Sequence, residues 1–307
     1  MEQKYWNFIK NIFKVLVTAG AIYWVSRKIS FEELKTTLWD ANLWFLLIAL
    51  LTYALSQIVA SSRLNSFFKC IQLNLTLRYN TRLYQLGLLY NFFLPGGIGG
   101  DGYKIYFLKK NFAVKGRKVL SAVFFDRLSG LWALGVVIGG LVIFMPRLAI
   151  PNSLTIICIL VATITYYYFL RSFFHAFSKK FIITHSKALL VQGLQTLTAV
   201  WILYALNFEG KFSPYLLIFM LSSLVAIIPS IGGGVGLRES LIAFGAVYFQ
   251  LDEHLAVLIS LLFYIISLLV ASSGVYYIFR PQGLGIEKLP NAKEIEKELE
   301  ITNAEEK

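Results

Sequence analysis

Six long apolar segments alternate with polar loops along the chain. Each supplies about as many apolar residues as a helix needs to cross the ~30 Å hydrocarbon core of a bilayer. They are residues 8–26, 43–61, 119–145, 152–170, 188–206 and 254–279. The pattern predicts an all-α polytopic membrane protein with six spans.

Two further apolar segments are interrupted by glycine and proline, which break helices. Residues 81–94 precede the sequence PGGIGGDG and residues 103–108 follow it, while residues 214–228 and 237–250 flank PSIGGGVG in the same way. Residues 81–94 would extend only ~21 Å as a helix, which is too short for a span. Backbone groups that have lost their helical hydrogen bonds are tolerated inside the membrane only where protein or a water-filled cavity satisfies them. We therefore predict two re-entrant helical hairpins.

The two interruptions repeat one motif, 134 residues apart. When residues 95–104 are aligned with residues 229–238, four positions are identical and a fifth keeps a cation. The identical pairs are Pro95/Pro229, Gly99/Gly233, Gly100/Gly234 and Gly102/Gly236, and the cations are Lys104 and Arg238. Glycine- and proline-interrupted segments in matching halves of a membrane protein are typical of a transporter's binding site.

Loop charges favour hairpins that return to the side from which they enter. With that topology, loops 63–82, 109–118 and 171–187 share one side and hold 13 Lys and Arg, against five in the opposite loops. The positive-inside rule places the 13 cations, and with them both chain termini, in the cytoplasm. Three spans separate the hairpins, so the hairpins enter from opposite sides. The halves, about 1–147 and about 148–281, would then form an inverted repeat whose hairpin tips meet near the midplane.

Composition agrees with a membrane protein and excludes several other classes. Hydrophobic residues make up 57% of the 307 positions, charged residues 15%, and the net charge is +12. The membrane domain, residues 1–281, is basic. The excess of Lys and Arg in cytoplasmic loops and the attraction of cations to anionic lipid headgroups explain this charge, so no nucleic-acid partner is expected. Residues 282–307 form a charged cytoplasmic tail. Two distant cysteines without neighbouring ligands predict no disulfide, metal site or cofactor.

The glycine motifs predict anion sites. Each break leaves N–H donors at the start of a half-helix, where the helix dipole also attracts a phosphate or carboxylate. Lys104 and Arg238 fall in the first turn of those half-helices, with Asp101 and Glu239 as counter-charges. Asp126 and Arg127 lie at similar depth on the span that follows the first hairpin. Such charges are costly in a bilayer and mark either a transport pathway or ion pairs that hold the hairpins in place.

Three motifs together resemble a known family. The first hairpin LPGGIGGDGYKIYFL, the segment AVFFDRLSGL and the second hairpin IPSIGGGVGLRES are similar to the flippase-like family related to lysylphosphatidylglycerol synthase. That family includes the membrane half of the multiple peptide resistance factor, and the resemblance covers residues 8–281. Larger relatives carry a soluble aminoacyl-transferase domain after the membrane part. Only the 26 residues of the charged tail follow the membrane part here, so aminoacyl-transferase activity is not expected.

The resemblance also implies a set of functional positions. The family commonly has arginine at the position of Lys104, and lysine keeps the charge but loses bidentate phosphate binding. The implied positions are Arg63, Asn91, Pro95, Gly99, Gly100, Asp101, Gly102, Lys104, Asp126, Arg127, Pro229, Gly233, Gly234, Gly236, Arg238 and Glu239.

These observations predict a protein of a prokaryotic cell membrane that moves a polar lipid between leaflets. The lipid would be an anionic or aminoacylated phospholipid, or a glycolipid. Two alternatives stay open. One is a non-transporting accessory or scaffold for a separate lipid-modifying enzyme, and the other is an intramembrane enzyme that uses Asp101 or Glu239 as an acid or base. Membrane lipid is the expected partner, with a homo-oligomer or a lipid-modifying enzyme as the protein partners to be tested.

Overall fold

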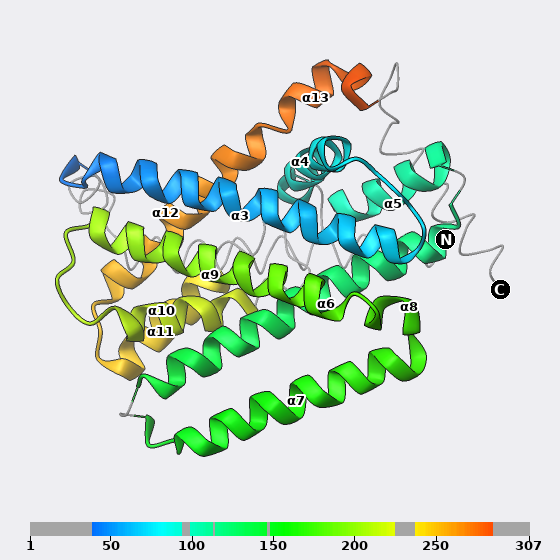
Figure 1. Ribbon diagram of the computed structural model, residues 1–307. Helices are drawn as coiled ribbons and strands as arrows, with labels where there is room; N and C mark the ends of the chain where they lie inside the picture. Colours follow the sequence, from blue (N-terminus) through cyan, green and yellow to red (C-terminus); the bar gives the residue numbers. More distant parts are fainter. Residues whose placement is uncertain (1–38, 94–98, 113, 146–147, 225–236, 285–307) are drawn as a thin grey trace, which may run out of the picture.

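The computed structural model describes residues 39–93, 99–112, 114–145, 148–224 and 237–284, and all regular structure in these ranges is helical (Figure 1). The helices are α3 (Leu43–Cys70), α4 (Leu77–Phe93), α5 (Gly99–Phe112), α6 (Gly116–Ile143), α7 (Asn152–Phe173), α8 (His175–Ser178), α9 (Phe181–Ala205), α10 (Phe212–Ser223), α11 (Leu237–Phe249), α12 (Glu253–Ser272), α13 (Val275–Phe279) and the short 3-10 helix η4 (Pro281–Leu284).

Five of these segments are long and apolar enough to cross a membrane. They are α3, α6, α7, α9 and the stretch Glu253–Phe279, which includes α12 and α13. The prediction of an all-helical membrane protein is confirmed, and these five segments match five of the six expected spans. The sixth, residues 8–26, lies outside the described residues, as does the tail from residue 285 onward.

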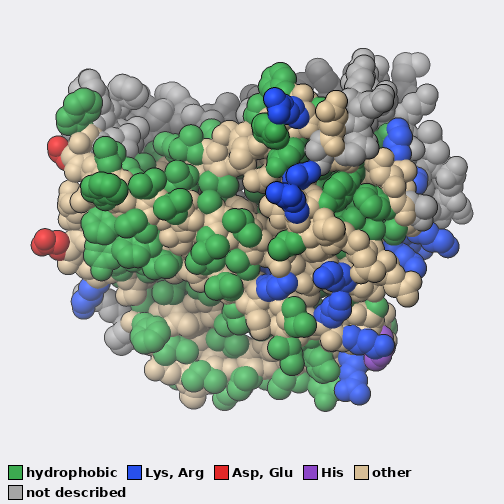
Figure 2. Space-filling view, turned by 45° about the horizontal axis from the view of Figure 1, so that its top comes forward, with side chains coloured by type: hydrophobic (Ala, Val, Ile, Leu, Met, Phe, Trp, Pro, Cys, Tyr) green, Lys and Arg blue, Asp and Glu red, His purple; other side chains and the backbone are tan. Residues whose placement is uncertain are grey.

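Apolar side chains cover the outer surface of the bundle, as expected of a protein bathed in lipid. Helix α7 is the clearest case, because Leu154, Ile157, Leu160, Val161 and Ile164 are each more than half exposed. Figure 2 shows hydrophobic side chains across one face of the molecule, with most of its Lys and Arg side chains toward the right-hand side. Lipid tails would cover such a surface.

Helices α3 and α9 form the most extensive pair, and they run side by side through the middle of the molecule (Figure 1). Small buried residues line the pair, among them Ala60 on α3 and Ala188 and Ala199 on α9. Small side chains let helix backbones approach closely, which drives helix association in membranes. The Asn42 N–H donates to the Ala205 carbonyl (2.8 Å), so the start of α3 meets the end of α9 and the pair is antiparallel.

The interior divides into two hydrophobic clusters, each containing one of the predicted hairpins. One cluster packs α10, α11 and α12 against α9 and the first half of α3, around Ile202, Phe219 and Leu262. The other packs α4 and α5 against α6 and the second half of α3, around Phe67 and Tyr103. We call α4 with α5 the first helix pair and α10 with α11 the second helix pair.

Some predicted boundaries were wrong, and one cause recurs. Helix α3 continues to Cys70 instead of ending at residue 61, and α9 begins at Phe181 instead of residue 188. In both extensions, cations that had indicated loops, Arg63 and Lys187, form polar contacts with neighbouring helices. A helix can continue through a charged residue at depth when a neighbouring helix satisfies that charge.

The predicted glycine break of the first hairpin is also shorter than expected. Helix α5 already begins at Gly99, so Gly99, Gly100 and Gly102 are helical. The Asn91 side chain at the end of α4 accepts a hydrogen bond from the Gly100 N–H (2.9 Å), which satisfies a donor that the first turn would otherwise leave open. A Cβ added at Gly100 would overlap the Gly87 carbonyl oxygen, so α4 and α5 approach each other backbone to backbone.

Candidate functional site

A bidentate ion pair joins α3 to α6. Arg63 donates from Nε to Asp126 Oδ1 (2.8 Å) and from Nη2 to Asp126 Oδ2 (3.1 Å). The exposed fractions of the two side chains are 8% and 11%, so this is a buried pair with the fork geometry that guanidinium and carboxylate favour. Gly130 lies beside it, where an added Cβ would come within 3.2 Å of Arg63 Nη1.

Asp101 is the centre of a second group of charges. Its Oδ1 accepts a hydrogen bond from Lys104 Nζ (2.7 Å), one turn along α5, and its Oδ2 forms an ion pair with Arg127 of α6. Lys104 is 4% exposed, and its ammonium also lies 4.8 Å from the centre of the Tyr84 ring on α4. The Asp101 carboxylate therefore compensates a buried lysine and links α5 to α6.

The two groups of charges are continuous, because Asp126 and Arg127 are neighbours on α6. Asp126 pairs with α3 and Arg127 with α5, so three cations and two carboxylates tie α3, α5 and α6 together. The structure thus brings together Arg63, Asp101, Lys104, Asp126 and Arg127. In the first helix pair, the charge of Lys104 is compensated by Asp101 of the same helix. This is the arrangement expected if the charges are ion pairs that hold the hairpins in place.

The cation of the second helix pair, Arg238, has neutral partners. Arg238 donates from Nε to the Ser222 hydroxyl (3.1 Å) and from Nη2 to the Ser223 hydroxyl (3.3 Å). Its guanidinium carbon lies 4.3 Å from the Phe219 ring centre and 5.3 Å from that of Phe263. Within the part of the chain that the structure describes, Arg238 forms no ion pair with a carboxylate.

The neighbouring carboxylate, Glu239, is directed to another helix. It is 2% exposed, and its Oε1 accepts a hydrogen bond from Ser260 of α12 (2.9 Å). The aligned motifs explain the contrast, because the position of Asp101 in the first hairpin is occupied by Val235 in the second. The two halves therefore hold equivalent cations in unlike surroundings.

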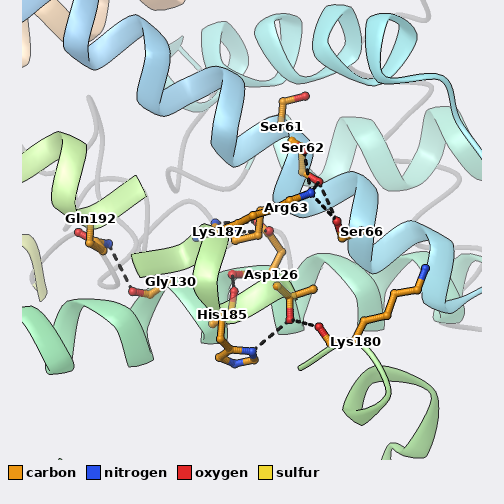
Figure 3. A network of polar contacts seen from close by, with 12 residues as sticks. Ser61, Ser62, Arg63, Ser66, Asp126, Gly130, Lys180, His185, Lys187 and Gln192 are labelled. Carbon is orange, nitrogen blue, oxygen red and sulfur yellow. Dashed lines mark hydrogen bonds and ion pairs between the residues drawn. The ribbon is translucent and has the colours of Figure 1, made fainter. Parts of the chain in front are cut away.

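A further polar contact between α3 and α9 was missed by the sequence reasoning (Figure 3). Lys187 Nζ donates to the Ser62 hydroxyl (2.8 Å), the Ser62 carbonyl (3.2 Å) and the Ser66 hydroxyl (2.9 Å). Nearby, His185 is 3% exposed and stacks on Phe181 with ring centres 3.8 Å apart. The serines one turn apart on α3 were the available signal for the lysine contact.

The remaining predicted positions fall into two groups. Asn91, Gly99, Gly100 and Gly102 lie where the first helix pair turns, as described above. Five others lie outside the described residues, namely Pro95, Pro229, Gly233, Gly234 and Gly236. No group of three or more metal-ligating side chains occurs among the residues that were placed.

The chain matches a known family of membrane proteins. A family model described as the lysylphosphatidylglycerol synthase TM region matches residues 11–273, which include every helix from α3 to α12. A search of curated proteins gives no match.

Proposed function

The chain belongs to the lysylphosphatidylglycerol synthase transmembrane-region family, and from that premise we propose that it moves a polar lipid between the two leaflets of a cell membrane. The cargo would be an anionic or aminoacylated phospholipid, or a glycolipid. Family membership supports a membrane protein of lipid metabolism or transport, and the bundle of apolar helices agrees with it.

The environment of Arg238 is the observation that carries the proposal. Arg238 is partly buried, and a guanidinium drawn away from water is costly unless an anion accompanies it. Ser222 and Ser223 supply only neutral hydroxyls, and they occupy Nε and Nη2. The aromatic rings of Phe219 and Phe263 hold the guanidinium in place without neutralising it. A lipid phosphate would complete this site, because arginine binds phosphate oxygens with its remaining N–H groups.

We further propose that both helix pairs are re-entrant hairpins within an inverted repeat. The packing of α4 against α5 and of α10 against α11 supports this arrangement, since each pair is formed by consecutive short helices. The loops that would be cytoplasmic follow α3, α5 and α7, and those that would be external precede α3, α7, α10 and α12.

Cysteine labelling tests this topology. In a variant without Cys70 and Cys158, single cysteines at Lys110 and Lys180 should react with an impermeant maleimide only from the cytoplasmic side. A cysteine at Lys211 should react only from outside; the Lys211 side chain makes no helix-capping hydrogen bond, so its replacement leaves α10 intact. Labelling of position 110 from outside would contradict a re-entrant first helix pair.

Transport by the purified protein in liposomes tests the function. We expect the wild-type protein to accelerate the movement of fluorescent phosphatidylglycerol between leaflets without a partner. Arg238→Gln should slow it by about tenfold or more, because a hydrogen bond to a charged group contributes about 1.5–3 kcal/mol. Arg238→Lys should retain part of the rate, since the charge remains.

The matched control is Arg280→Gln. Arg280 is exposed and its guanidinium lies against the ring and hydroxyl of Tyr276, so this variant should transport normally. Thermal stability measured on the same preparations separates lost transport from lost folding. A stable Arg238→Gln protein with the full rate would refute the phosphate role. A wild-type protein that moves no lipid would favour a scaffold, and chemically altered lipid would favour an enzyme.

A further inference from the structure

An aromatic cavity lies at the end of the bundle where α9 ends and α3 and α10 begin. It has a volume of about 620 Å³ and is lined by Phe45, Tyr204, Phe208 and Phe212, with Asn207 and Glu209 completing the wall. Residues 207–210 form the predicted external loop between α9 and α10, and Phe45, Tyr204 and Phe212 lie at the adjoining helix ends. No lining residue is among the described partners of Lys104 or Arg238. The cavity therefore requires an explanation of its own.

The four rings form a continuous aromatic wall. Tyr204 stacks on Phe45 with ring centres 5.5 Å apart and meets Phe212 edge-on at 5.0 Å, and Phe212 in turn lies 5.6 Å from Phe208. Gly210 contributes by its lack of a side chain, because a Cβ there would overlap the Phe208 ring. Packing within the loop thus holds Phe208 in its position at the cavity.

An ordinary interfacial belt does not account for this arrangement. Belts are enriched in Trp and Tyr, whose polar atoms reach the headgroup region. Here three of the four lining rings are phenylalanines, which have no polar atom. They also line an open hollow that has room for a small organic group.

The charges around the cavity favour a cation. Glu209 is the charged residue among those that line it. The Asp40 carbonyl accepts a hydrogen bond from Asn207 Nδ2 (3.2 Å), which places this second acidic residue beside the wall. A third acidic residue, Asp252, lies nearby, because its N–H donates to the hydroxyl of Tyr215 (3.1 Å), whose ring packs against Phe208. The exposed Lys211 follows Gly210 in the sequence but does not line the cavity. In Figure 2 the acidic side chains lie at the left-hand edge, away from most of the basic ones.

We propose that this cavity binds an organic ammonium group. Aromatic faces attract cations through their quadrupoles, and cages of such rings recognise quaternary ammonium groups in particular. Glu209 adds a full negative charge at the wall. The ammonium could belong to a lipid headgroup or to a water-soluble amine, and the shared chemistry is the same. The proposal goes beyond lipid movement, since it concerns a cation at a separate site and requires no transport.

Saturation-transfer NMR on the purified protein tests it directly. The protein would be placed in phosphatidylglycerol nanodiscs, which contain no amine lipid, and titrated with choline or with its neutral isostere 3,3-dimethylbutan-1-ol. Magnetisation should pass from the protein to the choline methyl groups, and the isostere should bind at least about fivefold more weakly because it lacks the charge. Equal binding of the two would overturn the proposal.

Two conservative variants locate the site. Phe45→Leu keeps the apolar bulk but removes a ring face, and Glu209→Gln keeps the shape but removes the charge. Each should weaken choline binding by about threefold, and the double variant by about tenfold. The matched controls are Phe144→Leu, an exposed ring at the end of α6, and Glu253→Gln in the first turn of α12, which should bind as the wild type does.

The lipid composition of the nanodiscs shows whether the natural ammonium belongs to a lipid headgroup or to a soluble amine. If a headgroup is the natural occupant, nanodiscs containing phosphatidylethanolamine should reduce choline binding to the wild type but not alter it further in the double variant. Unchanged binding in those nanodiscs would assign the site to a soluble amine. Choline binding that is unaffected by Phe45→Leu and Glu209→Gln in well-folded protein would overturn the assignment of the cavity.

Discussion

Arg63→Met should lower the free energy of unfolding by about 3–5 kcal/mol, because it leaves the Asp126 carboxylate buried without its partner. The pair is bidentate, both side chains are nearly inaccessible to solvent, and it joins two residues that lie 63 positions apart in sequence. Unfolding of the detergent-solubilised protein, followed by tryptophan fluorescence, would measure the loss. Asp126→Ala should be similarly destabilising, since it leaves the buried Arg63 guanidinium without its partner.

The double variant Arg63→Met/Asp126→Ala separates pairing from packing. With both charges removed, no uncompensated ion remains, so the double variant should be more stable than either single one. Arg171→Met is the matched control, because Arg171 is exposed near the end of α7 and should tolerate the change. Additive losses in the double variant would show that the two residues are not energetically coupled.

The same pair is connected to the charges of the first helix pair. Asp126 fixes α6 against α3, and its neighbour Arg127 reaches Asp101 on α5. Asp101 in turn compensates Lys104. Disrupting the Arg63–Asp126 pair should therefore loosen the first helix pair as well, which makes the charge group a positioning device for α5 and not only a local contact.

The apolar segments predicted most of the helices, and the errors occurred where charges are satisfied at a distance. Arg63 and Lys187 had suggested loop, and each lies inside a helix. A hydropathy pattern treats such residues as facing water, because it cannot include a partner on another helix. Asp126 lies 63 residues from Arg63, and Ser62 lies 125 residues from Lys187. Only the folded arrangement brings those partners together.

The repeated motif located the two tip cations, but alignment implied an equivalence that their surroundings do not share. Lys104 pairs with Asp101, whereas Arg238 has serine hydroxyls and aromatic rings. The difference was already present in the alignment as Asp101 against Val235. Gly87 carried no such signal, because a single glycine within an apolar segment does not indicate which helix will approach it.

Gly100→Ala should destabilise the protein by about 1–3 kcal/mol, as overpacking of a tight interior does. The new Cβ would overlap the Gly87 carbonyl oxygen, and because this atom belongs to the backbone, α4 and α5 would have to separate. Separation would also disturb the hydrogen bond from the Gly100 N–H to Asn91 Oδ1 (2.9 Å). Gly87→Ala should be intermediate, since its Cβ would meet the flexible Lys104 side chain first.

Gly102→Ala is the matched control in the same helix, and it should act in the opposite direction. No described atom lies within 4 Å of a Cβ at Gly102, so alanine fits without displacement. Alanine favours the helix over glycine by about 0.8–1 kcal/mol, so this variant should gain stability. Thermal unfolding of the two purified variants measures both signs. Equal losses would mean that the glycines serve the backbone turn before α5, and equal gains would mean that α4 and α5 do not pack backbone to backbone.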